Sequence, residues 1–183
     1  MSCWRTTCPS PMGKLTLASD GTCLTGLWLE GQRYFDAALE ANSQPREDLA
    51  VFCAARAWLD RYFAGQQPAI CQLPLAPQGS AFRQTVWRLL CQIPYGEVTS
   101  YGALAKQAAE VLGRPAGCAQ AVGGAVGHNP ISIIIPCHRV IGADGSLTGY
   151  AGGIEKKAWL LAHERDTARP AERAGCGRFF DIR

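Results

Sequence analysis

Hydrophobic and polar positions alternate in the first part of the chain. Leu15 and Leu17 alternate with polar neighbours, and a second apolar run over residues 23–29 follows the turn-forming pair Asp20-Gly21. Two such runs on either side of a turn are typical of a β-hairpin. The pattern therefore predicts paired strands near residues 14–18 and 23–29.

A helical interval then replaces this alternation. Over residues 46–63 the apolar positions include Leu49, Phe52 and Leu59, and Gly65 ends the pattern. This spacing predicts an α-helix.

Residues 66–80 contain three prolines and a glycine and predict an inter-domain linker. We accordingly expect an N-terminal domain over residues 1–76, a C-terminal domain over 77–170 and a tail over 171–183.

The second half begins with two predicted helices. The first has an apolar face over residues 82–93 and ends at Pro94. The second is capped by Thr99 or Ser100 and runs to about residue 112, where Gly113 ends it.

A third predicted helix has Pro115 in its first turn and ends near Gly127. It is rich in glycine and alanine, and such a face lets a partner backbone approach closely, at a cost in helix propensity. Two helices joined by a short turn predict either a DNA-binding helix-turn-helix or ordinary core packing.

A β-branched run places a cysteine beside a histidine. Residues 131–140 predict a buried strand that presents Cys137 next to His138 just after Pro136. A neighbouring imidazole can raise the thiolate fraction of a cysteine, and the thiolate is the nucleophile. On spacing alone, Cys137 is either a nucleophile or a small buried hydrophobe.

Composition places the chain among folded globular proteins. Hydrophobic residues make up 48% and charged residues 18% of it. The longest apolar stretch is far short of the roughly 20 residues that a membrane helix needs. The first residues lack the charged and then apolar pattern of a secretory signal. We expect a cytoplasmic protein that does not enter a membrane.

Cysteine usage and charge add two expectations. Nine cysteines form no repeating interval, so we expect reduced thiols, most of them in the core. Residues 81–170 carry 9 Lys and Arg against 6 Asp and Glu, whereas residues 1–80 carry 6 against 7. An anionic partner is therefore expected to meet the second half.

The segment from Pro136 to Val140, preceded by Asn129-Pro130, resembles the signature of the O6-alkylguanine-DNA alkyltransferases, which move alkyl groups from guanine in DNA onto their own cysteine. Further motifs follow the family's order: FRQTVW at 82–87, IPYGEVTSY at 93–101, AVGGA at 121–125, TGYAGG at 148–153 and AWLLAHE at 158–164. They span essentially all of residues 80–165. The first half resembles the family through SPMGKL at 10–15.

The resemblance implies an α/β N-terminal domain with a ribonuclease H-like fold. It implies a mostly helical C-terminal domain of the winged-helix or helix-turn-helix type. The implied function is DNA repair, in which an internal cysteine accepts the alkyl group of O6-alkylguanine or O4-alkylthymine once per molecule. It further implies double-stranded DNA as the partner, a monomer and no cofactor.

Carried over residue by residue, the resemblance makes Cys137 the acceptor thiolate. His138 links the thiol through a water to Glu164, and Tyr101 gives a proton to the departing guanine. Asn129 orients the turn before the predicted strand. The ordinary alternatives are a helix-start aromatic for Tyr101 and a surface charge at a helix end for Glu164.

The resemblance also implies a pocket and a DNA interface. The residues that line the alkylguanine pocket are Pro136, Val140, Tyr150, Ala151, Gly152 and Gly153. A helix from about residue 116 enters the minor groove and the target base is flipped out. The implied DNA contacts are Thr99, Ser100, Arg114, Ala116, Gln120, Ala121, Gly123 and Gly124.

Gln120 departs from the family pattern. It stands where the resemblance implies an arginine that fills the hole left by the flipped base, and we expect the nearby Arg114 to substitute for it in part.

We expect no metal site. The spacing of the family's zinc ligands is absent, and no histidine precedes His128. A four-cysteine site that includes Cys53 or Cys71 is the one alternative.

Two rival functions remain open at this point. One is a lesion-binding protein without enzymatic activity, whose known examples have a tryptophan in place of the cysteine. The other is a cysteine hydrolase that uses Cys137 and His138 with turnover on a small ester or amide.

Overall fold

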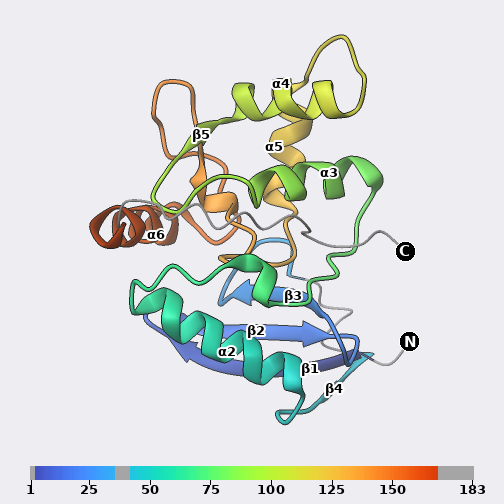
Figure 1. The fold of residues 1–183 in the computed structure, drawn as a ribbon, viewed down its shortest axis with the longest axis vertical. Helices are drawn as coiled ribbons and strands as arrows, with labels where there is room; N and C mark the ends of the chain where they lie inside the picture. The colour runs from blue at the N-terminus through green and yellow to red at the C-terminus, as the bar shows by residue number, and fades with distance from the viewer. Residues whose placement is uncertain (1–2, 36–41, 169–183) are drawn as a thin grey trace.

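The computed structural model describes residues 3–35 and 42–168, and its lower half is a four-stranded sheet with one helix against it (Figure 1). The strands are β1 (Cys3–Ser10), β2 (Gly13–Ser19), β3 (Leu24–Leu29) and β4 (Ser43–Pro45), in the order β3-β2-β1-β4. Strands β2 and β3 pair antiparallel, so the predicted hairpin is confirmed.

Strand β1 was not predicted. It pairs antiparallel with β2 from Trp4 opposite Ser19 to Ser10 opposite Gly13. Its inward side carries Thr6 and Cys8, which are small and partly polar, and this weakens the hydrophobic signal of a strand. The motif SPMGKL is the turn that joins β1 to β2.

Helix α2 (Ala50–Phe63) covers one face of the sheet. It begins four residues later than predicted, because Pro45 ends β4 and the amide of Arg46 donates to the carbonyl of Arg5 on β1. Gly65, with φ at +72°, ends the helix as predicted.

The predicted linker at residues 66–80 packs onto the sheet. It contains a 3-10 helix, η1 (Ile70–Gln72), and buries Leu73 and Leu75. The backbone of Leu24 on β3 bonds to the carbonyl of Pro74 and to the amide of Ala76. The prolines prevent regular structure here, but the alternating leucines still enter the core.

The upper half is mostly helical, with α3, α4 and α5 packed on one another and α6 beside them (Figure 1). Its elements are α3 (Ala81–Leu90), β5 (Thr99–Ser100), α4 (Tyr101–Val111), α5 (Ala119–Gly127), η2 (Cys137–Arg139), β6 (Val140–Ile141) and α6 (Ile154–Thr167). The hydroxyl of Ser100 accepts from the amide of Ala103, which confirms Ser100 as the cap of α4.

Helix α5 begins later than predicted. Pro115 and Ala116 belong to the connection after α4, and the helix starts at Ala119. Gly117 explains the delay, because a Cβ placed there would come within 2.1 Å of the carbonyl oxygen of Ala105. The chain presses against α4 at this point before it turns into α5.

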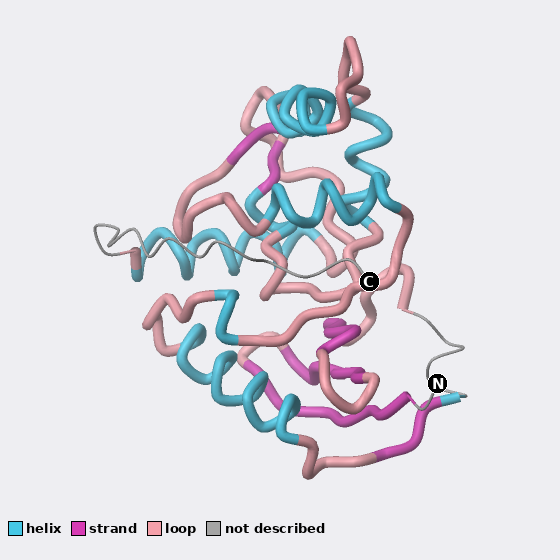
Figure 2. Tube along the Cα trace, turned by 45° about the vertical axis from the view of Figure 1, so that its right-hand side comes forward, coloured by secondary structure: helices cyan, strands magenta, loops and turns pink. Residues whose placement is uncertain are grey.

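Loops gather between the sheet and the helices and join the two halves (Figure 2). The amide of Leu27 on β3 donates to the carbonyl of Pro130, and the amide of Ser132 donates back to the carbonyl of Leu27, both at 2.8 Å. The hydroxyl of Ser132 donates to the side chain of Gln32. The segment that carries Cys137 is therefore anchored on the edge of the N-terminal sheet.

The structure also bears on the expectations for the cysteines and for a membrane helix. Among residues 3–35 and 42–168, seven cysteines are free thiols, whereas Cys71 is disulfide-bonded, so the expectation of reduced thiols is wrong for Cys71. Of the seven free thiols only Cys8, Cys91 and Cys137 are buried, so the expected core location is wrong for Cys3, Cys23, Cys53 and Cys118. No helix in the described part of the chain is long and apolar enough to cross a membrane.

Candidate active site

The segment before Cys137 is not the predicted strand. Residues 132–135 form turns, and Cys137 opens the 3-10 helix η2. Ile133 has φ at +69°, a left-handed conformation that is costly for a β-branched residue. A strained turn, rather than an extended strand, therefore presents the thiol.

Asn129 holds this turn together and touches the thiol. Its Oδ1 accepts from the amide of Ile131 at 3.0 Å, and its Nδ2 donates to the carbonyl of Ile135 at 2.8 Å. These bonds satisfy backbone groups that a strand would have paired with a neighbour. The same Nδ2 lies 3.1 Å from Sγ of Cys137. The sequence prediction for Asn129 included the turn but not this contact.

Burial raises the pKa of the Cys137 thiol, while the hydrogen bond from Asn129 and the positive charge of Lys157 oppose the shift. The resting thiol is therefore protonated at neutral pH. Because the thiolate is the nucleophile, reaction at Cys137 requires a group that removes this proton.

His138 follows Cys137 in the chain and forms a buried pair with Glu164. His138 Nε2 lies 2.6 Å from Glu164 Oε1, and neither side chain is exposed. A carboxylate only accepts hydrogen bonds, so Nε2 carries the hydrogen and Nδ1 keeps its lone pair. Nδ1 has no partner among the described residues. Burial lowers the pKa of His138 against the pull of Glu164, so the ring is neutral and able to accept a proton.

Glu164 is not a surface charge at a helix end, so that alternative interpretation of the sequence is wrong. It lies in the last turn of α6 and is fully buried. Burial would raise the pKa of its carboxyl, but the hydrogen bond from His138 and the charge and hydrogen bonds of Arg139 hold that pKa well below its usual range. Arg139 donates from Nε at 2.8 Å to Oε2 and from Nη2 at 3.0 Å to Oε1.

Two more donors to Glu164 were not predicted. The backbone amide of Gly96 lies 3.1 Å from Oε2, and the hydroxyl of Tyr62 lies 2.7 Å from Oε1. Gly96 falls within a motif of the resemblance. No sequence signal pairs Tyr62, 102 positions away, with the carboxylate.

Tyr101 is the first residue of α4, and its hydroxyl lies near enough to Cys137 for the thiolate to affect its pKa. Its hydroxyl donates to the carbonyl of Thr148 at 3.0 Å. Burial, with a smaller contribution from Cys137, raises the pKa of Tyr101 to about 12. The phenol therefore stays protonated at working pH and is able to donate.

Lys157 is a buried cation that sequence reasoning missed. Its Nζ donates to the carbonyls of Val140 at 2.5 Å and Thr148 at 2.7 Å and lies 5.8 Å from the ring centre of Tyr101. Burial lowers its pKa to about 8. Lysine on a helix is usually exposed, so the sequence gave no indication that Lys157 is buried.

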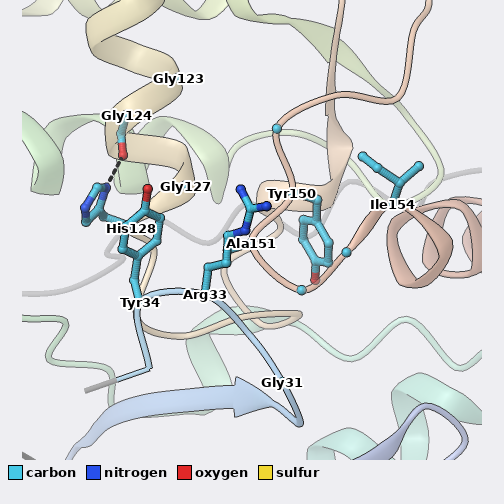
Figure 3. Close-up of a pocket in the computed structure, with 13 residues that line it drawn as sticks. Gly31, Arg33, Tyr34, Gly123, Gly124, Gly127, His128, Tyr150, Ala151 and Ile154 are labelled. Carbon is cyan, nitrogen blue, oxygen red and sulfur yellow. Dashed lines mark hydrogen bonds between the residues drawn. The ribbon is translucent and has the colours of Figure 1, made fainter. Parts of the chain in front are cut away.

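A cavity of about 590 Å³ lies between α5 and the loop that precedes α6 (Figure 3). Cys137 does not line this cavity, but burial, with a smaller contribution from Cys137, raises the pKa of the lining residue Tyr150 well above its usual value, which places Tyr150 near the thiol. Tyr150, Ala151, Gly152 and Gly153 line one side and the glycine face of α5 lines the other. Arg33, Tyr34 and His128 also line it, and none of the three was predicted as a site residue. Tyr34 stacks on the His128 ring at 4.0 Å between centres.

Pro136 and Val140 lie elsewhere. Both are buried and neither lines the cavity; Val140 pairs with Thr99 between β6 and β5.

The residues with expected DNA contacts occupy two segments. Gln120, Ala121 and Gly124 are exposed on α5, with the half-buried Gly123 between them. Arg114 and Ala116 lie in the exposed connection before α5, not on the helix. Thr99 and Ser100 form β5 at the start of α4, and both are half-buried. The expectation that the helix begins at about residue 116 is thus wrong by three residues.

Within residues 3–35 and 42–168, no group of three or more His, Cys, Asp or Glu side chains is placed to hold a metal ion. The four-cysteine alternative has no such cluster in this part of the chain.

The site thus holds a buried thiol followed in the chain by a neutral imidazole that is bonded to a buried carboxylate, and these residue types are the ones that nucleophilic catalysis by cysteine uses. Family models match both halves of the fold. Residues 4–77 match the ribonuclease-like domain of 6-O-methylguanine DNA methyltransferase, and residues 81–166 match its DNA-binding domain.

Known relatives cover most of the chain. The methylated-DNA–protein-cysteine methyltransferase of Haemophilus influenzae is 43% identical over 157 residues, 86% of this chain and 83% of that protein. The protein of the same name from Mycolicibacterium paratuberculosis is 47% identical over 159 residues, 87% and 90% of the two chains. A Mycobacterium tuberculosis OGT solved in complex with DNA is 45% identical, covers 90% of this chain and 94% of its own, and superposes with a TM-score of 0.77.

The chain therefore belongs to the 6-O-methylguanine DNA methyltransferase family. The expected α/β N-terminal domain and mostly helical C-terminal domain are confirmed.

Proposed function

We propose that this chain is a DNA repair protein that moves the alkyl group of O6-alkylguanine, or of O4-alkylthymine, from duplex DNA onto Cys137, once per molecule. The observation that carries this proposal is the buried thiol of Cys137 followed in the chain by the neutral imidazole of His138, which is bonded to the Glu164 carboxylate. The names of the relatives and the DNA bound to the Mycobacterium tuberculosis OGT support the substrate class.

The proposed reaction is a displacement at the alkyl carbon. The Sγ of Cys137 forms a bond to this carbon as the bond to guanine O6 breaks. The thiol proton passes through a water to Nδ1 of His138, and Glu164 stabilises the imidazolium. Tyr101 donates a proton to the departing guanine, because a purine anion is a poor leaving group.

The imidazolium then returns its proton through solvent to the Tyr101 phenolate. In total, one S–H bond and one C–O bond break, and one C–S bond and one guanine N–H bond form. A thioether is a poor leaving group, so the protein is not regenerated. This distinguishes the proposal from a hydrolase.

Access to the base requires flipping. Extrusion of a nucleotide from the stack costs a few kcal/mol. In our proposal the alkylguanine enters the cavity lined by Tyr150–Gly153, and the buried residues Pro136 and Val140 hold the two ends of the η2 turn that carries Cys137. Helix α5 meets the minor groove through Gln120, Ala121, Gly123 and Gly124. Arg114, Ala116, Thr99 and Ser100 flank this contact.

We further propose that the protein works as a cytoplasmic monomer without a cofactor. Its domains are assigned to residues 1–76 and 77–170. The tail at residues 171–183 lies outside the described residues.

The test counts alkyl groups. The protein is incubated with an excess of duplex DNA that holds one O6-methylguanine, and its intact mass is followed to completion. The proposal predicts one methyl group per protein and an equal amount of repaired guanine. No transfer with tight binding would indicate a lesion-binding protein instead. Turnover of a small ester or amide without a stable thioether would indicate a hydrolase.

A further inference from the structure

Tyr62 connects the N-terminal half to the buried carboxylate of the site. It lies in the last turn of α2, a helix that lies below α6 in the view of Figure 1. Its hydroxyl donates to Glu164 Oε1 at 2.7 Å, the same oxygen that faces His138 Nε2 at 2.6 Å.

The Glu164 carboxylate is held by competing donors. Arg139 reaches both oxygens, with Nε 2.8 Å from Oε2 and Nη2 3.0 Å from Oε1. A guanidinium group that donates two parallel hydrogen bonds to a carboxylate favours an arrangement in which both groups lie in one plane. The amide of Gly96 adds a donor to Oε2 at 3.1 Å, and the hydroxyl of Tyr62 adds one to Oε1 from the N-terminal half, on the oxygen that faces His138.

Tyr62 itself is rigidly placed. Its ring stacks on Trp58 with centres 5.5 Å apart, and its carbonyl accepts from His163 Nε2 at 2.9 Å. His163 is the neighbour of Glu164 in the chain. Burial and the charge of Glu164 raise the pKa of Tyr62 well above its usual value, so the hydroxyl remains a donor at all working pH values.

We propose that Tyr62 is a positioning residue through which the N-terminal domain sets the basicity of His138 and thereby the reactivity of Cys137. This inference deepens the proposed alkyl transfer and rests on it. Without the hydroxyl, the carboxylate turns toward Arg139 and His138 loses part of its support. Removal of the thiol proton then becomes harder.

The test compares Tyr62→Phe with Tyr95→Phe. The Tyr95 hydroxyl bonds to Thr167 at 2.7 Å, and its ring lies 5.8 Å from that of Tyr62. The control therefore removes a hydroxyl from the same aromatic cluster without touching Glu164. Both substitutions keep the rings and their packing.

The first readout is the rate at which iodoacetamide alkylates Cys137, followed by mass spectrometry of the Cys137 peptide as a function of pH. We expect Tyr62→Phe to raise the apparent pKa of Cys137 by about half a unit to one unit. The rates should converge at high pH, and Tyr95→Phe should match the unsubstituted protein. A deficit that is equal at every pH, or shared by Tyr95→Phe, would overturn the proposal. So would a Tyr62→Phe protein that does not fold, since the hydroxyl would then act on stability.

A double-mutant cycle provides the second readout. If Tyr62 acts through Glu164, Tyr62→Phe should have little further effect in a Glu164→Gln background, whereas additive effects would contradict that route. Methyl transfer from O6-methylguanine DNA at neutral pH should fall about three- to tenfold in Tyr62→Phe alone. If the unsubstituted protein transfers no methyl group but the iodoacetamide shift is present, the proposed function fails and the positioning role of Tyr62 stands.

Discussion

Arg139 and Glu164 form a bidentate ion pair closed off from solvent. The two bonds measure 2.8 Å and 3.0 Å, and Arg139 Nη1 also donates to the carbonyl of Ile93 at 2.6 Å. The residue that follows His138 in the chain thus orients the carboxylate that His138 uses. Such a pair carries a large desolvation cost and is stable only when both partners are present.

Removal of the Arg139 charge should therefore destabilise the fold. We expect Arg139→Met to lower the free energy of unfolding at pH 7 by about 3–5 kcal/mol, because it leaves a buried carboxylate without its cation. Urea unfolding measures this loss.

The pH dependence of the same variant provides a check. The pKa of Glu164 is depressed in the folded state, so its ionisation stabilises the fold above the unfolded-state pKa, and this contribution is lost as the pH falls below about 4.5. Arg139→Met should show a shallower loss of stability below that pH than the unsubstituted protein. Equal slopes would mean that Arg139 does not hold the Glu164 pKa down.

Asn129 should affect both the turn and the thiol. Asn129→Asp keeps the shape but loses the Nδ2 donor that contacts the carbonyl of Ile135 and Sγ of Cys137. We expect a loss of about 1–3 kcal/mol in stability. We also expect a higher apparent pKa of Cys137, because a carboxylate repels a thiolate. Asn129→Ala is the matched variant without the new charge and should raise the thiol pKa less. A thiol that titrates identically in both variants would argue against the contact.

The buried ammonium of Lys157 should be visible in the pH dependence of stability. Its pKa is lowered to about 8 from an ordinary value of 10.5. The unfolded chain therefore binds more protons between these values, and stability from this group rises with pH across that range. Relative to Lys157→Met, the unsubstituted protein should gain stability between pH 8 and about 10.5. Comparison of the two proteins cancels the titration of the other groups. A difference that is constant with pH would contradict a buried charged lysine.

Gln120 offers a gain-of-function test. Gln120→Arg on the exposed start of α5 should speed transfer on duplex DNA and leave reaction with the free base O6-benzylguanine nearly unchanged, because only the duplex needs a base flipped. The gain should be about 1–3 kcal/mol at most, if a charge-assisted hydrogen bond replaces a neutral one. Equal changes on both substrates would place residue 120 at the pocket. No change on either would mean that Arg114 or another group already supplies the function.

Regular spacing in the sequence was sufficient to predict that the hairpin, α2, α3 and α4 exist, although α3 ends at Leu90 and not at the predicted Pro94. Their hydrophobic intervals are local, and Ser100 caps α4 as its residue type suggests. Strand β1 was missed because Thr6 and Cys8 give a weak apolar signal. The turn before Cys137 was predicted as a strand because its isoleucines favour extended structure, whereas the side chain of Asn129 supplies the backbone bonds that allow it to bend.

The residues of the candidate site were also predicted only in part from the sequence. Cys137, His138 and Glu164 were predicted from motifs that the resemblance carries. Tyr62 and Lys157 were not, because their roles depend on burial and on contacts between segments far apart in the chain. A tyrosine on an amphipathic helix and a lysine near a glycine-rich loop have ordinary explanations until the fold is known.

The central claim is that Cys137 alone accepts the alkyl group. The most direct test is peptide mapping after complete reaction with duplex DNA that holds O6-methylguanine, with Cys137→Ser as the control. Cys8 and Cys91 are also buried free thiols and serve as internal comparisons. We predict one methyl group, found only on the peptide that contains Cys137, and none in the Cys137→Ser protein. Methyl groups on another cysteine, or more than one repaired guanine per protein, would contradict the account.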